Sequence, residues 1–276
     1  MRLLRGNPGI VVGYSGNEFV MGDALSIVDH RPWALPVHPW VMRQRWHSLL
    51  FAHWPIPAAE IAYRLPDGLV ADCFGGDAWI GVVPFTIDRI RFRGLGTVPG
   101  ASRFAELNLR TYVRDRRTGT PGIYFFSLDA ANPLAVVAAR TWFHLPYHWA
   151  RMSATTNDSG TVEYCSARRM AKEPVRFRAR YRGLGPTQRR KRSAIGSIEH
   201  FLTERYCIFT TDRRGQLLQG NLHHPPWPLE EAEAEIELNE LPQAHGLRLP
   251  QAPPVLYFAR DLAIYTWRPQ PIMALA

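Results

Sequence analysis

The sequence predicts a mainly β fold with a few helices, an α+β arrangement. From residue 66 onwards the apolar runs are short and are separated by glycine, proline and aspartate, a pattern typical of strands with tight connections. These runs are LVADCF, AWIGVVPF, IDRIRFR, ELNLRTYV and IYFFSLD. Hydrophobic residues make up 46% of the 276 residues, which is enough for a substantial core.

The first 65 residues have a different pattern of apolar and polar residues. Residues 1–28 form a poorly patterned leader, and HRPWALPVHPW (30–40) has three prolines, which favour an extended, packed segment. Apolar residues in WVMRQRWHSLLFAHW (40–54) recur at nearly helical spacing, so we expect one amphipathic helix there. No repeat, low-complexity tract or linker divides the rest of the chain, and we expect a single domain over residues 29–276.

Later elements follow from local signals. The glycine-containing tip between TYV (111–113) and IYFF (123–126) predicts a hairpin, and PLAVVAARTWF (133–143) predicts a helix that begins at proline. Strands follow in WARMSATTND, TVEYCSARR and PVRFRARYRG, and GSIEHFLTERYCIFTTD should begin as a helix and continue as a strand. AEAEIELNEL alternates acidic and apolar residues, which favours a strand with one wet face, and PVLYFARDLAIYTWRP should close the chain as a hairpin.

Composition excludes several classes of protein. The three cysteines lie far apart without a CxxC pair, no secretory h-region follows the first arginines, and no apolar run approaches the length of a membrane helix. We therefore expect a cytoplasmic protein with no membrane partner. P-loop, GxGxxG and GxSxG motifs are absent, so we expect no cofactor.

The two histidines of TWFHLPYHWA (141–150) raise the question of a metal site. His144 and His148 have the spacing of metalloprotease ligands, but Pro146 lies between them and no glutamate stands beside His144. His223 and His224 precede PPWP and are more typical of a turn than of a ligand pair. We predict no metal.

The basic residues are concentrated in residues 168–194. Nearly all are arginine, since Lys172 and Lys191 are the only lysines, and the formal net charge is +9. Arginines at 176, 178, 180 and 182 alternate with apolar residues, so a strand would present all four on one face. Such a row fits either a solvated outer face or the binding of RNA or acidic partners.

ELNLRTYV (106–113) is the strand of greatest functional interest. Glu106, Asn108, Arg110 and Tyr112 should point one way, while Leu107, Leu109, Thr111 and Val113 point the other. The row predicts either a lined cavity or a solvent face. Glu106 and Arg110 would be about 13 Å apart along the strand and would contact different parts of a ligand.

Several motifs in the same order resemble the YqjF-like proteins, an uncharacterised bacterial family with an acetoacetate-decarboxylase-like fold. The motifs lie between His30 and Trp267. They are HRPWALPVHPWVMRQRWHSLLFAHWP, AWIGVVPF, VPGASRFAELNLRTYV, GIYFFSLDA, ARTWFHLPYHWARM and HHPPWPL. The resemblance implies a β-barrel or cone of mostly antiparallel strands with peripheral helices. It also implies that Tyr147 and His148 stand where the decarboxylases have a lysine pair, one member of which forms a Schiff base.

From this resemblance we expect a pocket for a small carboxylate or oxo acid. Glu106, which is carried over from the family pattern, would act with His148 and Tyr147 as the acid–base groups. Arg110 would hold the carboxylate with Asn108 nearby, and Arg43 and Arg45, on the expected first helix, are weaker candidates. The two alternatives are a non-catalytic ligand-binding or sensor protein and a nucleic-acid or acidic-partner binder that uses the arginine row. The oligomeric state stays open, with a homo-oligomer as one option.

Overall fold

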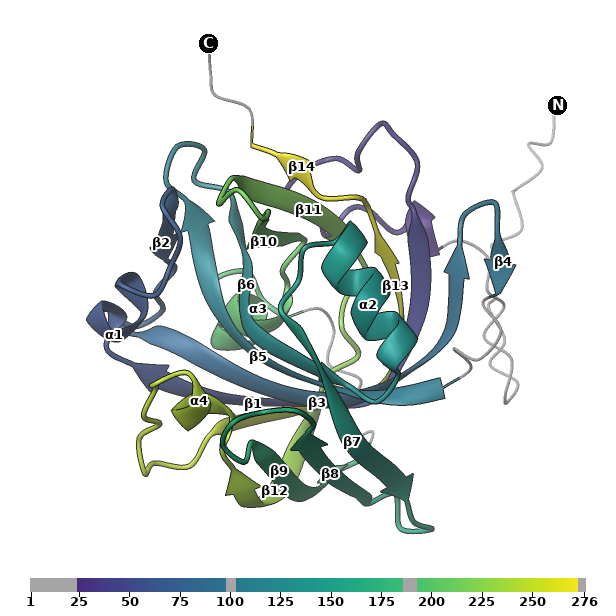
Figure 1. The fold of residues 1–276 in the computed structure, drawn as a ribbon, viewed down its shortest axis with the longest axis vertical. Coiled ribbons are helices and arrows are strands. Elements are labelled where there is room, and N and C mark those ends of the chain that lie inside the picture. The colour runs from purple at the N-terminus through teal and green to yellow at the C-terminus, as the bar shows by residue number, and fades with distance from the viewer. Residues whose placement is uncertain (1–23, 98–102, 186–192, 273–276) are drawn as a thin grey trace, which may run out of the picture.

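Strands dominate the structure, a computed structural model that describes residues 24–97, 103–185 and 193–272 (Figure 1). The strands are β1 (Met42–Ile56), β2 (Leu69–Ala71), β3 (Ala78–Phe92), β4 (Gly96–Thr97), β5 (Arg103–Asp115), β6 (Pro121–Ala130), β7 (Tyr147–Thr156), β8 (Val162–Arg168), β9 (Arg176–Gly183), β10 (Cys207–Thr211), β11 (Leu217–His223), β12 (Glu230–Asn239), β13 (Val255–Thr266) and β14 (Gln270–Pro271). The helices are η1 (Ala24–Ser26), α1 (Ala58–Ala62), α2 (Pro133–Trp142), α3 (Ile198–Thr203) and α4 (Leu241–Ala244).

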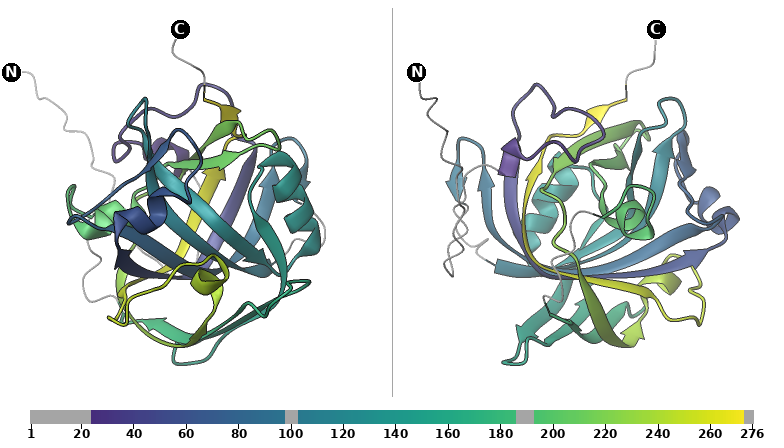
Figure 2. Two further views of the ribbon diagram at one scale, coloured as in Figure 1. Left: turned by 60° about the vertical axis from the view of Figure 1, so that its left-hand side comes forward. Right: turned by 180° about the vertical axis from the view of Figure 1, so that it is seen from behind.

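The strands close into two rings that share one wall. The order β6-β7-β8-β9-β12-β13-β1-β3-β5 returns to β6 through the β5–β6 pairing and forms a 9-strand barrel. A smaller ring uses the same β13, β1, β3, β5 and β6 but closes through β10 and β11, because β10 also pairs with β6 and β11 with β13. In Figures 1 and 2 the long strands β1 and β3 cross the molecule, with β7, β8, β9 and β12 on one side and β10 and β11 on the other. The expected β-barrel fold with peripheral helices is confirmed.

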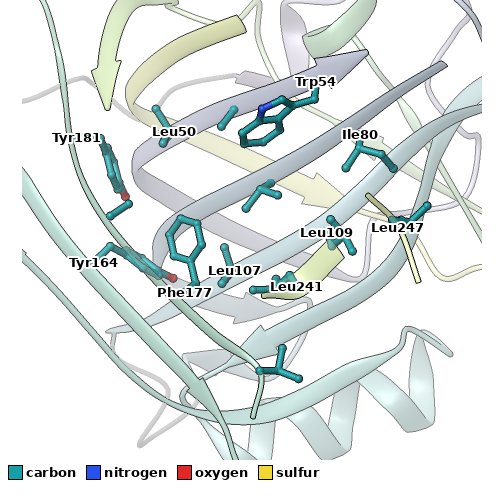
Figure 3. Close-up of a cluster of buried hydrophobic side chains, with 14 of the residues drawn as sticks. Leu50, Trp54, Ile80, Leu107, Leu109, Tyr164, Phe177, Tyr181, Leu241 and Leu247 are labelled. Carbon is teal, nitrogen blue, oxygen red and sulfur yellow. The ribbon is translucent and has the colours of Figure 1, made fainter. Parts of the chain in front are cut away.

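Each side of the shared wall has its own apolar core. Between the wall and strands β7, β8, β9 and β12, the buried side chains include Leu107 and Leu109 of β5 and Tyr164 and Phe177 of the covering strands (Figure 3). The other face of the wall, inside the smaller ring, carries a second core that includes Tyr112 of the same strand β5. Strand β5 therefore separates two interiors, and its two rows of side chains enter different ones.

The first expected helix is wrong, because residues 42–56 form the long strand β1. Their apolar spacing looked helical for two reasons. All residues from Leu49 to Trp54 are buried, so the strand shows no wet and dry alternation, and the register with β3 shifts between His47 and Ala52, where Ser48 has a positive φ of 50°. Arg43 and Arg45 accordingly lie on a barrel strand and not on a preceding helix.

The closing hairpin is also wrong, since residues 255–266 form the single strand β13. It pairs with β1 along its length, and Asp261 within it forms an ion pair with Arg45 of β1. The hairpin between β5 and β6, the helix from Pro133, strands β7 to β9 and the helix-to-strand change from α3 to β10 are confirmed. The wet face of β12 is confirmed too, with exposed glutamates at alternate positions.

The segment that precedes β1 packs on the end of the smaller ring. His223 and His224, expected in a turn, are instead buried: His223 ends β11, and its Nε2 lies 2.7 Å from the carbonyl oxygen of Ala24. His30 reaches the carbonyl oxygen of His224 at 2.7 Å, and buried Arg31 donates to the carbonyl oxygen of Leu222 at 2.9 Å. Residues 1–23 of the predicted leader lie outside the described residues. Within the described ranges, no helix has both the length and the apolar character needed to cross a membrane.

Candidate functional site

The polar row of β5 faces the interior of the smaller ring. Glu106, Asn108, Arg110 and Tyr112 are all buried, with at most 4% of each residue exposed. Their direction was predicted from the alternation of the sequence, but the solvent-face alternative is not what the structure shows. Four polar side chains in an apolar interior require partners, because an unpaired buried polar group is destabilising.

At one end of this row, Glu106 meets Tyr147. The Tyr147 hydroxyl, from the start of β7, donates a hydrogen bond of 2.9 Å to Oε2 of Glu106. Burial raises the pKa of Glu106 to about 8, against the opposing effect of this hydrogen bond. Burial, with the nearby Glu106 carboxyl, also holds the pKa of Tyr147 well above its ordinary value. The carboxyl group is therefore mostly protonated near pH 7 and can both donate and accept a proton.

At the other end of the row, Arg110 and Tyr112 bind helix α3 and strand β1. Nη2 of Arg110 donates to the Tyr112 hydroxyl at 3.1 Å and to the carbonyl oxygen of Leu202 at 3.2 Å, and the Tyr112 hydroxyl donates to the same carbonyl at 2.7 Å. His53 of β1 completes the group through a contact of 2.6 Å between its Nε2 and the Tyr112 hydroxyl. Burial, with the positive charge of Arg110, lowers the pKa of His53, so this imidazole is neutral.

A glycine makes room for this cluster. Gly81 of β3 lies directly between His53 of β1 and Arg110 of β5 in the strand register. A Cβ atom at Gly81 would lie 2.8 Å from Nε2 of His53 and 3.3 Å from Cγ of Arg110. The missing side chain is what allows the imidazole and the guanidinium stem to approach each other over β3.

Three polar atoms of this interior group have no partner among the described residues. They are Oδ1 of Asn108, Nε of Arg110 and Nδ1 of His53. Asn108 and Arg110 are on the same face of β5, two residues apart. Buried groups without a protein partner are uncommon in folded proteins, and several together on one wall are typical of a place that receives water or a ligand.

His148 does not share this wall. Consecutive residues of a strand point to opposite faces, so Tyr147 meets Glu106 while His148 faces the other interior. Burial lowers the pKa of His148 to about 4, assisted by the charges of Arg168 and Arg140. Its register partner on β6 is Asp129, which is buried and bound by Nε of Arg168 at 2.9 Å. His148 was expected to act with Glu106, but the side chain that contacts Glu106 is Tyr147.

The two rings separate along β6, and a cavity of about 340 Å³ lies at that point. Strand β10 pairs with β6 at Ile123 and Tyr124, and β7 pairs with the same edge only from Leu128 onwards. The cavity between them is lined by Phe125, Arg140, His144, Tyr147, His148 and Arg213, among others. Because Phe125 also belongs to the core of the smaller ring and is the register partner of Arg110, the cavity adjoins the polar wall.

The remaining expected site residues lie elsewhere. Arg45 pairs with Asp261, and Arg43 is opposite Arg91 on β3, six residues or about 20 Å along the strand from Phe85, the register partner of Glu106. His144 follows α2 in a left-handed conformation and His148 lies on β7, so they do not share a helix. Among the described residues, no three His, Cys, Asp or Glu side chains form a group that could hold a metal ion.

The arginine row of β9 is matched by acidic residues on its neighbours. Arg176, Arg178, Arg180 and Arg182 are on the exposed face, as predicted. Their ion pairs are with Glu240, Glu237, Glu163, Glu235 and Glu233. The glutamates of β12 thus offset much of the positive charge that had suggested a nucleic-acid surface. Residues 186–192, the second part of the basic region, lie outside the described residues.

Sequence reasoning missed His53, Gly81 and the carbonyl of Leu202. His53 lies in a segment that was predicted to be a helix, so its position on the wall was not foreseen. Leu202 contributes only its carbonyl oxygen, which no sequence pattern predicts. Gly81 left a signal: a glycine within the otherwise apolar run AWIGVVPF is typical of a close approach by another group.

The fold is that of the acetoacetate-decarboxylase-like proteins. The enduracididine biosynthesis enzyme MppR, in a structure with pyruvate, is similar over 86% of this chain and 92% of its own, with a TM-score of 0.57 and 10% identity. The acetoacetate decarboxylase of Legionella pneumophila is similar over 95% of this chain and 100% of its own, with a TM-score of 0.54 and 12% identity. At these identities the likeness establishes the fold alone.

The chain belongs to the DUF2071 family, described as an uncharacterised conserved protein, whose model matches residues 43–263. It is 43% identical to the uncharacterised protein YqjF of Bacillus subtilis (strain 168) over 234 residues, which covers 85% of this chain and 93% of that protein. The resemblance to YqjF-like proteins is confirmed.

Proposed function

We propose that the protein binds a small carboxylate or oxo acid inside the smaller ring, and that it acts on this ligand without a Schiff base. The observation that carries the proposal is the wall of β5, on which a carboxyl group with a pKa of about 8, an amide and a guanidinium follow one another in an otherwise apolar interior. Perturbed pKa values beside unpartnered polar groups are typical of functional sites.

The two ends of the wall suit the two ends of an oxo acid. Nε of Arg110 has no partner among the described residues and can donate to a carboxylate, for which a guanidinium is well shaped. The amide of Asn108 lies between Arg110 and Glu106, within reach of a carbonyl group. The neighbour MppR, whose structure contains pyruvate, supports a 2-oxo acid as the first ligand to test.

Glu106 and Tyr147 are the groups we assign to proton transfer. A protonated carboxyl group can donate its proton to the carbonyl oxygen of an oxo acid as negative charge develops there, and the resulting carboxylate can accept the proton that leaves the adjacent carbon, which yields the enol and restores the carboxyl group. Tyr147 holds the Glu106 side chain by the hydrogen bond of 2.9 Å. This chemistry fits enolisation, hydration or a related lyase step better than decarboxylation.

The lysine content argues against Schiff-base chemistry. A Schiff base needs a primary amine close to the ligand carbonyl, and this sequence has two lysines. Lys172 is exposed in the loop between β8 and β9, and Lys191 is outside the described residues. At the positions that resemble the lysine pair of the decarboxylases stand Tyr147 and His148, neither of which forms an iminium.

The cavity between β7 and β10 supplies a route to the wall. It lies where β6 passes from one ring to the other, and Arg140 and Arg213 on its rim would attract an anion. Phe125 and Tyr147 line both the cavity and the interior, so small movements of these two side chains would admit a ligand.

Non-catalytic binding is the second candidate. It is favoured by the engagement of Arg110 with Tyr112 and the carbonyl oxygen of Leu202, which fixes the guanidinium as a recognition group rather than a mobile one. Binding without turnover and binding with turnover are separated by one measurement, the exchange of substrate protons with solvent.

The test is binding and proton exchange with pyruvate and a panel of 2-oxo and 3-oxo acids. Isothermal titration should detect a ligand in wild type, and proton NMR in D₂O should show loss of the pyruvate methyl signal as its protons exchange. Glu106→Gln should keep binding within a few fold and lose the exchange. Exchange at an unchanged rate in Glu106→Gln would show that this carboxyl group is not the acid–base group.

Two controls complete the test. Arg178→Ala, which alters an exposed arginine of β9, should behave as wild type in both assays. Borohydride treatment in the presence of pyruvate should leave the protein mass unchanged, because no iminium forms. A mass increase would establish a Schiff base and refute the lysine-independent proposal.

A further inference from the structure

We propose a second ligand site, for a small phosphate-bearing anion, at the opposite end of the shared wall. A cavity of about 440 Å³ lies there, between the beginning of β1, the hairpin from β3 to β4 and the end of β13. Its lining includes Trp40, Arg43, Arg91, Arg93 and Tyr265. It is separate from the β5 wall and does not depend on the function proposed for that wall.

The arginines concentrate positive charge on this cavity. Arg43 of β1 and Arg91 of β3 are direct register partners, and like charges that face each other across two strands are destabilising. Arg93, two residues further along the chain from Arg91, lines the same cavity. Among the described residues that line the cavity, none is acidic. An anion that binds between the guanidinium groups would offset the positive charge that they bring to this cavity.

Two of the three arginines are also ordered in advance. The guanidinium of Arg43 lies over the ring of Tyr265 at 5.5 Å, and that of Arg93 lies over the ring of Trp40 at 5.4 Å. The two rings meet edge to face at 5.5 Å, and the backbone amide of Arg93 donates to the carbonyl oxygen of Val41 at 3.0 Å. Side chains held in this way lose little conformational freedom on binding, which raises affinity.

The chemistry of the lining favours phosphate. Guanidinium groups bind phosphate oxygens in pairs, and three of them around one cavity can neutralise a ligand with two or more negative charges. The faces of Trp40 and Tyr265 are occupied by Arg93 and Arg43, so these rings support the arginines rather than a ligand ring. A compact polyanion such as an organic phosphate or diphosphate fits this lining.

The turn between β3 and β4 contributes Gly94 to the lining of the cavity. Gly94 has a φ of +81°, in the left-handed region that glycine adopts easily, and a Cβ atom there would meet nothing within 4 Å. A side chain at Gly94 would therefore strain this tight turn beside the cavity.

Isothermal titration with inorganic pyrophosphate in 150 mM NaCl tests the site, with citrate as a carboxylate of similar charge. Wild type should bind pyrophosphate more tightly than citrate. Arg91→Gln and Arg93→Gln should each weaken binding by about tenfold to hundredfold, as expected when one charged donor is removed. Arg151→Gln, which removes an exposed arginine from β7, is the matched control and should change affinity by less than about twofold.

The stability of the unliganded variants separates a ligand role from a structural one. Arg91→Gln removes one of two facing positive charges, so its melting temperature without ligand should equal or exceed that of wild type while the rise caused by pyrophosphate is lost. The proposal is overturned if wild type does not bind pyrophosphate, if Arg151→Gln weakens binding as much as Arg91→Gln, or if Arg91→Gln melts well below wild type. Tighter binding of citrate than of pyrophosphate would overturn the assignment to phosphate.

Discussion

Strands β5 and β9 both alternate polar with apolar residues, yet their polar rows differ in what surrounds them. The arginines of β9 lie on the exposed face, and carboxylates of the neighbouring strands and of Glu240, just after β12, offset each of them. The polar row of β5 is buried, and two of its atoms, Oδ1 of Asn108 and Nε of Arg110, have no partner among the described residues. A row of charges therefore says little about a binding site until the partners of each charge are known.

The comparison predicts a large loss of stability when a side chain of the buried polar row of β5 is truncated. Arg110→Ala removes the donor to Tyr112 and Leu202 and leaves a space in the interior, so the free energy of unfolding should fall by about 2–3 kcal/mol. Urea denaturation measures this change. A loss below about 0.5 kcal/mol would mean that the guanidinium is solvated and that the contrast with β9 is false.

Filling the gap at Gly81 should have the next largest effect. The new Cβ in Gly81→Ala would lie 2.8 Å from His53 and would displace it, at about 1–3 kcal/mol of stability. Gly220→Ala, in β11, is the matched control, because its Cβ would meet only the side chain of Pro269 at 3.3 Å and then more distant atoms. Equal losses in the two variants would show that the close packing over Gly81 is not specific.

The buried carboxyl group should give the protein a distinctive dependence on pH. The folded pKa of Glu106 is raised to about 8 from 4.5, so the folded state holds its proton more tightly and the contribution to stability is full below pH 4.5. That contribution is lost as pH rises from 4.5 through 8. Glu106→Gln should lack this fall. Its free energy of unfolding, measured by urea denaturation, should therefore rise relative to that of wild type as pH increases over this range.

The histidines do not interfere with that difference. His148 and His223 have folded pKa values of about 4, so their contribution is present above pH 6.5 and is lost as pH falls from 6.5 towards 4 in both proteins. A pH-independent difference between wild type and Glu106→Gln would contradict the assignment of a protonated carboxyl group.

The smallest effect is expected on β9. Arg178→Ala breaks one exposed ion pair with Glu237 at 3.5 Å, and the free energy of unfolding should change by less than about 0.5 kcal/mol. A loss close to that of Arg110→Ala would remove the distinction between the two rows.

The sequence predicted the direction of the β5 side chains, because each face of that strand enters a different environment and the alternation is clean. The same reasoning failed for residues 42–56, where both faces are buried and an irregular register removes the period of two. Strand alternation could also have separated Tyr147 from His148, since adjacent residues of one strand cannot face the same interior.

Other parts of the wall depend on contacts that no local pattern encodes. His53, Gly81 and Leu202 are far apart in the chain and meet Arg110 only because β1, β3 and β5 are neighbours and α3 lies against them. The partners of the β9 arginines come from β8, from β12 and from Glu240 just after β12, so their neutralisation could not be predicted before the strand order was known.

The pairing of β1 with β13 also constrains how the chain folds during synthesis. Met42 is opposite Thr266, so both rings close only after nearly the whole chain has left the ribosome. Until then β1, whose middle residues are all buried in the finished fold, has one long edge without its partner. A fold that joins its first long strand to its last long strand has a high contact order and is expected to form slowly. During that interval the exposed edge of β1 is open to chaperones and to aggregation.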